Sequence, residues 1–410
     1  MERKNILLLR AGFHKEFALK SLIEEGFGLI IIDEPNSKLI PFAHNMYSID
    51  SIWNQEEVFE VAKKAYIENH CSGVLSFLDS STVALGKISD YLGLNYYSEE
   101  DGRILANKVR VREMLESKKL NNVRFKKVHT RNDVYEAIDE FGLPAVIKPS
   151  DRSASKGVII LRTRDDVDKA YEESFSFSKN RELLIEEYVE GCEYCVELMI
   201  INSTPYIMAV SEKEVSDIKY CVELKDITPA RISLQVFEKI KNYLYKVIVN
   251  LGFCNGIIHI EIKIQNEKIK IIEINPRCAG GNLLESIYHL SKYNPYVNLA
   301  YLSCGLSEKV EIPKPINYET CGMFTLYDTF SYSGEMGIIQ SIKNMSFFDE
   351  IKKNSNEKFL LYIDKGDLIG KPRNNEDCIG SIYLFDESYN NLLERCNKIK
   401  NSLEIVIRNA

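Results

Sequence analysis

One stretch constrains the fold of this chain more than any other: CNGIIHIEIKIQNEKIKIIEINPRCAGG, residues 254–281. Apolar and polar residues alternate on both sides of a short polar segment, a pattern that predicts two antiparallel strands and a tight turn. In the register that we predict, Gln265 pairs with Ile269 across a three-residue loop. That register sets Glu261 directly opposite Glu273, so two carboxylates meet in the middle of a hairpin.

Two carboxylates that face each other across a ladder repel, so another group must neutralise them. The same register sets His259 opposite Asn275, one pair further along. A divalent cation is one solution, because carboxylate and amide oxygens suit Mg²⁺ or Mn²⁺. A solvent-facing glutamate paired with a nearby lysine is the alternative, and a register slip of one residue is another.

The first hundred residues alternate short apolar runs with helical patterns. The predicted strands are 5–10, 28–33 and 73–79, and the predicted helices lie around 15–25 and 56–69. Such alternation predicts a parallel sheet with helices on its faces. The first turn, RAGFHKE, lacks the G-x-G-x-x-G pattern, so no nicotinamide or flavin cofactor is expected there. A small-ligand pocket at the strand ends stays an alternative.

Beyond about residue 105 the order of the predicted elements changes. Strands are expected at 125–130, 144–150 and within 182–202, and helices at 133–141 and 234–251. After Pro313 the chain carries further strands and an amphipathic helix near 386–401. The whole chain therefore predicts an α/β (α+β) protein of several domains.

Composition narrows the class of protein. The formal net charge of −8 argues against nucleic-acid binding. No stretch reaches the roughly 18 apolar residues of a membrane span, and the N-terminal apolar run suits a buried strand better than a signal peptide. The ten cysteines are scattered, and the close pair of Cys192 and Cys195 has no second pair to complete a zinc site. We expect reduced thiols in a cytoplasmic protein.

Further polar groups fit a nucleotide site. Lys148 ends the apolar strand AVIK and should point into a cavity. The small residues of SDRSASKG, 150–157, would let backbone N–H groups approach phosphate oxygens. The linker 186–189 can offer backbone edges to adenine, and Glu193 can accept from ribose hydroxyls. An ordinary surface turn and a charged loop are the alternatives for these two segments.

In order, these stretches resemble the ATP-grasp carboxylate–amine ligases. The motifs are NKVRVREML, PAVIKPSDRSASKGV, LLIEEYVEGCEYCVE and HIEIK…IIEINPRCAGG. Within that family the layout most resembles the L-amino acid ligases, which join two amino acids. The resemblance implies an ATP-grasp fold with three parts: a Rossmann-like preATP-grasp domain (1–104), an ATP-grasp domain (105–312, small lobe about 125–190, large lobe about 191–312) and a C-terminal α/β subdomain (313–410).

The resemblance also implies roles in binding ATP and metal. The residues that would contact the nucleotide are Lys108, Lys148 and Lys213 at the phosphates, Ser153, Ser155 and Gly157 in the covering loop, Glu186, Glu187 and Val189 at adenine, and Glu193 at ribose. The residues that would hold two Mg²⁺ ions, for which Mn²⁺ can substitute, are Glu261, Glu273 and Asn275. The loop has a single Gly, so Lys156 is a second candidate for shaping it.

Catalysis and substrate binding follow from the same resemblance. Arg277, with Lys148 and Asn275, would stabilise the transferred phosphoryl group. Gly280 and Gly281 would let the carboxylate substrate approach the backbone. Arg231 is a candidate partner for a substrate carboxylate, and a surface loop is an equal alternative.

The implied reaction needs no protein nucleophile. ATP would phosphorylate a carboxylate, and an amine would then attack the acyl-phosphate to give an amide, ADP and phosphate. The expected substrates are a small-molecule carboxylate and an amine, both amino acids, and a symmetric homodimer is the default oligomer. Two rivals stay open: a carboxylase of the same fold that uses bicarbonate, and a non-catalytic nucleotide-binding protein.

We predict that Glu273→Gln and Arg277→Ala each abolish amino-acid-dependent ADP release, because one removes a metal ligand and the other a charge that stabilises the phosphoryl group. Circular dichroism should show an unchanged fold. Near-wild-type turnover of either variant would contradict the site assignment.

Overall fold

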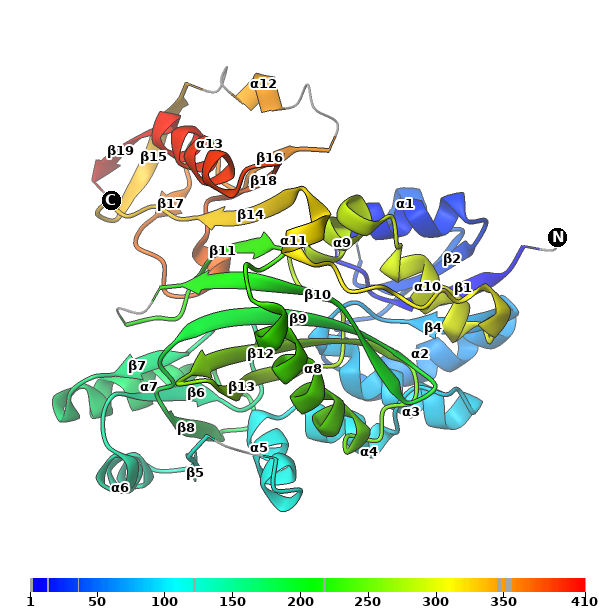
Figure 1. The fold of residues 1–410 in the computed structure, drawn as a ribbon, viewed down its shortest axis with the longest axis horizontal. Helices are drawn as coiled ribbons and strands as arrows, with labels where there is room; N and C mark the ends of the chain where they lie inside the picture. Colours follow the sequence, from blue (N-terminus) through cyan, green and yellow to red (C-terminus); the bar gives the residue numbers. More distant parts are fainter. Residues whose placement is uncertain are drawn as a thin grey trace.

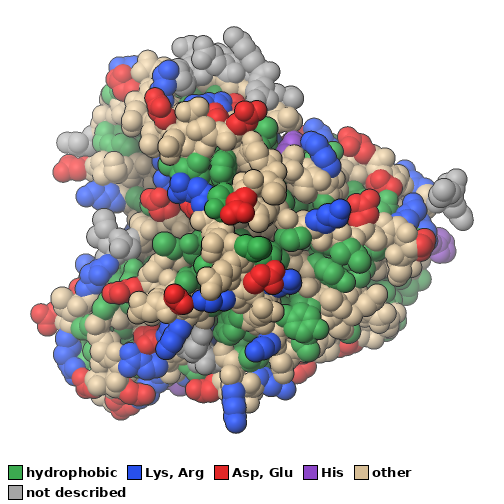
Figure 2. Space-filling view, in the orientation of Figure 1, with side chains coloured by type: hydrophobic (Ala, Val, Ile, Leu, Met, Phe, Trp, Pro, Cys, Tyr) green, Lys and Arg blue, Asp and Glu red, His purple; other side chains and the backbone are tan. Residues whose placement is uncertain are grey.

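The computed structural model describes residues 3–12, 15–35, 37–120, 123–216, 219–344, 348–351 and 356–409. Figure 1 shows the fold, in which helices and four sheets form a mixed α/β structure, as predicted. Acidic and basic side chains are interspersed over the face seen in Figure 2. No helix within the described ranges is long and apolar enough to cross a membrane.

The N-terminal domain is built on a parallel sheet of order β3-β2-β1-β4, as the alternating pattern predicted. Its strands are β1 (Asn5–Leu9), β2 (Gly28–Asp33), β3 (Asn45–Ser48) and β4 (Cys71–Leu75). Its helices are α1 (Glu16–Glu24), α2 (Gln55–Glu68) and α3 (Thr82–Leu92), with the 3₁₀ turns η2 (Ile40–Phe42) and η3 (Asp79–Ser81). The apolar runs of β1 and β2 are buried because helices cover the sheet.

Two helices lead to a second sheet, which we call the small lobe together with its helices. The connecting helices are α4 (Glu99–Leu105) and α5 (Lys108–Ser117). The sheet has the order β5-β8-β6-β7, with β5 (Phe125–Val128), β6 (Ala145–Pro149), β7 (Ile159–Leu161) and β8 (Leu183–Glu187). It packs on α6 (Arg131–Phe141) and α7 (Val167–Phe177), which share one apolar core with it, and the 3₁₀ turn η4 (Arg164–Asp166) precedes α7.

The largest sheet has eight strands in the order β13-β12-β9-β10-β11-β14-β18-β16. Its first five strands along the chain are β9 (Cys192–Ile201), β10 (Thr204–Val215), β11 (Glu223–Thr228), β12 (Gly256–Gln265) and β13 (Lys268–Asn275). The remaining strands are β14 (Phe324–Phe330), β16 (Lys358–Leu361) and β18 (Gly380–Asp386). Because β11 pairs with β14, one sheet runs without a break from the central region into the C-terminal part.

The other elements pack around this sheet. They are α8 (Leu234–Val249), α9 (Leu283–Ser291), α10 (Pro295–Ser303), η5 (Ser307–Lys309), α11 (Tyr318–Cys321), α12 (Phe348–Ile351), η7 (Asn375–Asp377) and α13 (Tyr389–Ser402). A small sheet of order β17-β15-β19 ends the fold, with β15 (Gly337–Lys343), β17 (Leu368–Ile369) and β19 (Glu404–Asn409). We call residues 324–409, as described, the C-terminal part.

The hairpin of β12 and β13 differs from the prediction in its loop. Gln265 pairs with Lys268, so the turn is two residues long, Asn266 and Glu267, and the predicted three-residue loop is wrong. Both turn residues have positive φ, 48° and 63°, as a type I′ turn requires. A bulge next to Glu261 shifts the register, and Glu261 still stands opposite Glu273.

Glu267→Gly should stabilise the protein by about 1 kcal/mol, because glycine adopts positive φ without the cost that an L side chain carries. Urea unfolding would measure the change in unfolding free energy. Lys239→Met is the matched control, because it removes the 2.9 Å ion pair with Glu267 and leaves the turn residue unchanged. A variant less stable than this control would contradict the turn assignment.

Candidate active site

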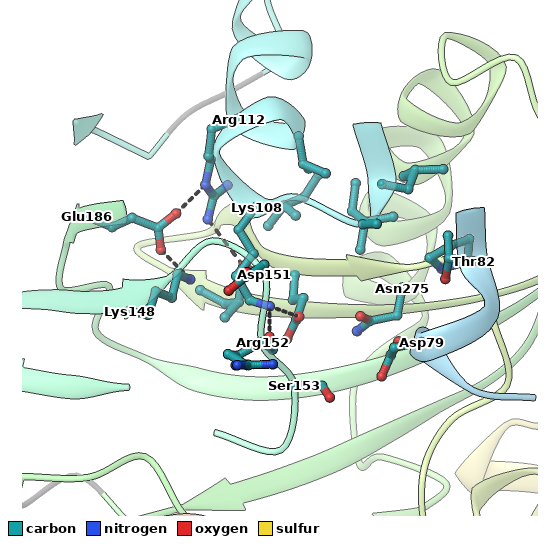
Figure 3. Close-up of a pocket in the computed structure, with 18 of the residues that line it drawn as sticks. Asp79, Thr82, Lys108, Arg112, Lys148, Asp151, Arg152, Ser153, Glu186 and Asn275 are labelled. Atoms are coloured by element: carbon teal, nitrogen blue, oxygen red, sulfur yellow. Dashed lines mark hydrogen bonds and ion pairs between the residues drawn. The ribbon is translucent and has the colours of Figure 1, made fainter. Parts of the chain in front are cut away.

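Two neighbouring pockets lie where the N-terminal domain, α5, the small lobe and β13 meet, and Figure 3 shows the first of them, pocket A. Pocket A is lined by residues that include Asp79, Thr82, Arg112, Asp151 and Asn275. Pocket B is lined by residues that include Val146, Ser155, Val189, Lys213 and Glu261. Both pockets share Lys108, Lys148, Ser153, Glu186 and Glu273.

Glu186 is the centre of a buried charge cluster between the two pockets. Its carboxylate accepts from Arg112 Nε and, at 2.6 Å, from Lys148 Nζ (Figure 3). Burial alone would raise the pKa of this carboxyl, but the charges of Arg112 and Lys148 outweigh it and lower the pKa to about 2. Glu186 therefore fixes the direction of Lys148. Arg112, which sequence reasoning missed, is the second cation.

The opposed glutamates each receive a lysine from a distant part of the chain. Lys108 Nζ of α5 lies 2.9 Å from Glu273, and Lys213 Nζ of β10 lies 2.6 Å from Glu261. Burial opposes the charge of Glu261, yet Lys213 and His259 hold its pKa well below the usual range. The cross-strand repulsion is thus neutralised by two ion pairs, neither of which uses a lysine of the hairpin.

A second layer of polar groups surrounds Glu261. His259 Nε2 lies 3.3 Å from the Glu261 carboxylate, and His259 Nδ1 lies 2.5 Å from Glu197. Lys213 also donates to Glu223 at 2.8 Å. Asn275 is buried opposite His259, and its side-chain amide forms no hydrogen bond with the described part of the chain. Its oxygen is therefore available to a ligand at the edge of pocket A.

Arg277 is held by the N-terminal domain. Its Nε lies 2.5 Å from Oδ1 of Asp79, and its Nη1 donates to the Cys278 carbonyl at 2.9 Å. Burial opposes the charge on Asp79, but Arg277 lowers the pKa of this carboxyl below its usual value. Sequence reasoning did not find Asp79. The available signal was its position just beyond β4, because ligands collect at the carboxyl ends of parallel strands.

The predicted phosphate loop turns sharply beside pocket B. Ser153 and Ser155 line the pocket, and Ser155 and Gly157 have positive φ. Gly157 is not among the lining residues, and the side chains of Pro149 and Phe177 occupy the space that a Cβ atom would need there. Lys156 points elsewhere, since its Nζ lies 2.6 Å from Glu376.

The C-terminal part reaches this loop through η7. The Asn375 N–H donates to the Ala154 carbonyl at 3.1 Å, and the Asn375 side chain accepts from the Glu223 N–H at 3.0 Å. Asn375 is also a lining residue of pocket B. No sequence pattern indicated this contact.

The predicted adenine linker forms one end of pocket B. The Glu187 carboxylate is engaged by Arg124 at 2.7 Å and Lys270 at 2.8 Å, and the Val189 carbonyl accepts from Lys263 at 3.1 Å. Apolar side chains that line this end are Val146, Val158, Ile160 and Ile272. Glu193 lies 3.5 Å from Lys263 and 3.7 Å from Lys213, so its expected ribose contact would compete with two lysines.

Three predicted substrate residues line neither pocket. The Arg231 guanidinium lies 3.3 Å from Glu212 and 3.3 Å from the centroid of the Tyr389 ring, so the structure does not bring it to the site. Gly280 has no atom near its Cβ position, whereas Gly281 has a φ of 51° and the Tyr327 ring against it. Gly281 is therefore required by packing.

Part of the chain matches a known domain family. Residues 141–285 match the ATP-grasp domain family, and this segment contains Lys148, Glu186, both opposed glutamates and Arg277. The chain therefore contains a segment that is similar to the ATP-grasp domain, as the motifs predicted. Its fold is the ATP-grasp fold, as the motifs predicted.

Relatives and solved structures show how far the likeness extends. D-alanine–D-alanine ligase of Phocaeicola vulgatus is 33% identical over 147 residues, which are 34% of this chain and 44% of that ligase. The chain thus spans about half the length of the curated relatives that it matches. L-amino acid ligase from Bacillus licheniformis superposes with a TM-score of 0.83 at 18% identity and covers 100% of both chains.

A third likeness is to a carboxylase. The biotin carboxylase domain of the Hydrogenobacter thermophilus 2-oxoglutarate carboxylase, solved with MgADP, ADP and bicarbonate, gives a TM-score of 0.72 at 13% identity. The match covers 98% of this chain and 91% of that one. At these identities the two solved structures show that this chain shares their fold.

The Glu186 cluster predicts an acid-dependent stability. The lowered pKa means that the ionised carboxyl stabilises the fold above pH about 4.5, its unfolded value, and that this contribution, about 3 kcal/mol in full, is lost as pH falls towards 2. Glu186→Gln should lower the unfolding free energy at pH 6 by about 3 kcal/mol, because Lys148 and Arg112 lose their carboxylate. The substitution should also make the unfolding free energy decline less steeply between pH 5 and pH 3.

Urea unfolding at several pH values would test this. Glu136→Gln is the matched control, since Glu136 pairs with Lys126 on the exposed surface. An equal acid dependence in the wild type and Glu186→Gln would disprove the role of the cluster.

Proposed function

We propose that this ATP-grasp protein is an ADP-forming ligase that activates an amino acid as an acyl-phosphate and couples it to an amine. One observation carries the proposal. The opposed carboxylates of Glu261 and Glu273 line pocket B, and the buried Asn275 follows Glu273 by two residues on β13 and lines pocket A. Lysines 108, 148 and 213 and Arg277 border the same pocket B. Oxygen ligands and converging cations together suit a metal-bound polyphosphate.

Different parts of pocket B suit different parts of an ATP molecule. The adenine would lie between the apolar side chains at residues 146, 160 and 272, next to the 187–189 linker. The phosphates would lie against Lys148 and Lys108, with Ser153 and Ser155 as further donors. Glu186 supports this role because it fixes Lys148 by a 2.6 Å ion pair.

The donor set fits magnesium. Glu261, Glu273 and Asn275 would hold one or two Mg²⁺ ions, with Mn²⁺ as an alternative, and the free Asn275 side chain is the observation that favours this fit. Bound Mg²⁺ would supply positive charge to the phosphate oxygens. Lys108 and Lys213 neutralise the carboxylates in the structure and would share them with the cation.

The reaction has two balanced steps. A carboxylate oxygen attacks the γ-phosphorus of ATP, the bond to the β-phosphate oxygen breaks, and ADP leaves. The amine nitrogen then attacks the acyl carbon, phosphate leaves, and a proton passes from the nitrogen to solvent. Arg277, oriented by Asp79, would stabilise the charge on the phosphoryl group in both steps. The 150–157 loop, tied to η7, would exclude water from the acyl-phosphate.

Two likenesses favour an amino acid as the acid. The D-alanine–D-alanine ligase is 33% identical to this chain over 147 residues, and the L-amino acid ligase shares its fold over the full length. The biotin carboxylase likeness favours the second candidate, in which bicarbonate is the carboxylate.

A screen of ATP, Mg²⁺ and all pairs of the twenty amino acids should give phosphate release that depends on one or a few pairs, with the dipeptide mass in the products. Glu261→Gln should lower this rate by about 100-fold, because it removes a metal ligand and a charge. Glu238→Gln, an exposed partner of Lys241, is the matched control and should leave the rate unchanged.

Bicarbonate-stimulated phosphate release without an amine would establish the second candidate instead. If ATP with Mg²⁺ gave no thermal shift, the assignment of the nucleotide site itself would be overturned.

A further inference from the structure

Lys15, just before α1, is a buried cation that the proposed reaction has not used. Its side chain is 6% exposed, and its Nζ donates to the Ala279 carbonyl at 2.6 Å. Burial lowers the pKa of Lys15, and the nearby charge of Arg277 adds to this shift. An ammonium group has three N–H donors, so one carbonyl leaves it only partly satisfied.

Its charge has no carboxylate partner among the residues that the structure describes. The other buried Lys and Arg side chains in those ranges are Arg112, Lys148 and Lys213, and each forms an ion pair with a glutamate. Glu197 and Glu285 act on Lys15 only from a distance, because their carboxylates contact His259 and Lys358. A buried, unpaired cation is costly unless an anion joins it.

Lys15 contacts the segment that begins at Arg277. It donates to the carbonyl of Ala279, and Arg277 Nη1 donates to the carbonyl of Cys278, so two cations hold consecutive carbonyls. Lys15 lines neither pocket A nor pocket B, whereas Arg277 lines pocket B. Lys15 therefore contacts the segment that begins at Arg277 without lining the pocket proposed for the phosphates.

The N-terminal domain brings this cation to the site by its topology. Strands β1 and β4 are neighbours in the parallel sheet, and their carboxyl ends lead to Lys15 and Asp79. Asp79 holds Arg277 and Lys15 holds Ala279, so both loops meet the same 277–279 segment. Ligands of parallel α/β sheets bind at this edge.

We infer that Lys15 binds the carboxylate of the amine substrate, so that the acceptor is an amino acid and not a simple amine. This inference rests on the proposed ligase function. An amino acid acceptor keeps its own carboxylate through the reaction, and a cation beside Arg277 would neutralise that group while the amine faces the acyl carbon. The acid substrate's carboxylate has a different place, at the metal and phosphate groups of pocket B.

The test compares an acceptor amino acid from the pair screen with its carboxamide, which has the same side chain and amine but no carboxylate. The wild type should prefer the amino acid. Lys15→Met should raise KM for the amino acid about 10- to 100-fold, the effect of losing one charge-assisted hydrogen bond. Its KM for the carboxamide should change less than twofold, and Lys15→Arg should recover part of the preference.

Lys20→Met is the matched control, because Lys20 lies on α1 in an exposed pair with Glu16. An equal loss for both acceptors would show that Lys15 only supports the 277–279 segment and would overturn the inference. If Lys15→Met does not fold, a wild type that accepts the carboxamide as readily as the amino acid overturns it equally. A wild type inactive with every amino acid pair but active with bicarbonate would overturn the proposed function first.

Discussion

The repulsion between Glu261 and Glu273 is the constraint on which the rest of the site depends. A β-ladder holds the two carboxylates opposite each other, and the structure offsets this with Lys108 from α5 and Lys213 from β10. Each ion pair also connects the hairpin to another element, so the pairs that neutralise the charges also position α5 and β10 around the pockets. The metal-bound phosphate that we propose as the ligand would compete with these lysines for the carboxylates.

Most of the buried charged side chains described in this site form ion pairs. Glu186 sits between Lys148 and Arg112, and Asp79 holds Arg277. These pairs join separate parts of the fold: Asp79 of the N-terminal domain holds Arg277, which follows β13, and Glu186 of the small lobe holds Arg112 of α5. Such pairing fixes side-chain directions before a ligand binds, which is what transition-state stabilisation by positioned charges requires. Lys15 departs from this balance, and for that reason its environment points to an anionic ligand.

The C-terminal part contributes to the same site. Strand β14 extends the large sheet beyond β11, and Asn375 meets both Ala154 and Glu223 at pocket B. The loop proposed to cover the phosphates is thus fastened at one side by a segment more than two hundred residues away in sequence. This contact gives the C-terminal part a direct effect on loop geometry.

The sequence by itself determined the strands, the parallel N-terminal sheet and the opposition of Glu261 and Glu273, because alternation and turn chemistry are local properties of the chain. The predicted length of the hairpin loop was nevertheless wrong, and a bulge restored the pairing of Glu261 with Glu273. The sequence did not indicate this bulge, because a bulge leaves the alternation of neighbouring residues almost unchanged. Only the tertiary structure decided which lysines neutralise the glutamates, that Asp79 holds Arg277 and that Arg231 lies elsewhere against Tyr389. The physical reason is that ion-pair partners are chosen by distance in space, and the packing of four sheets sets that distance.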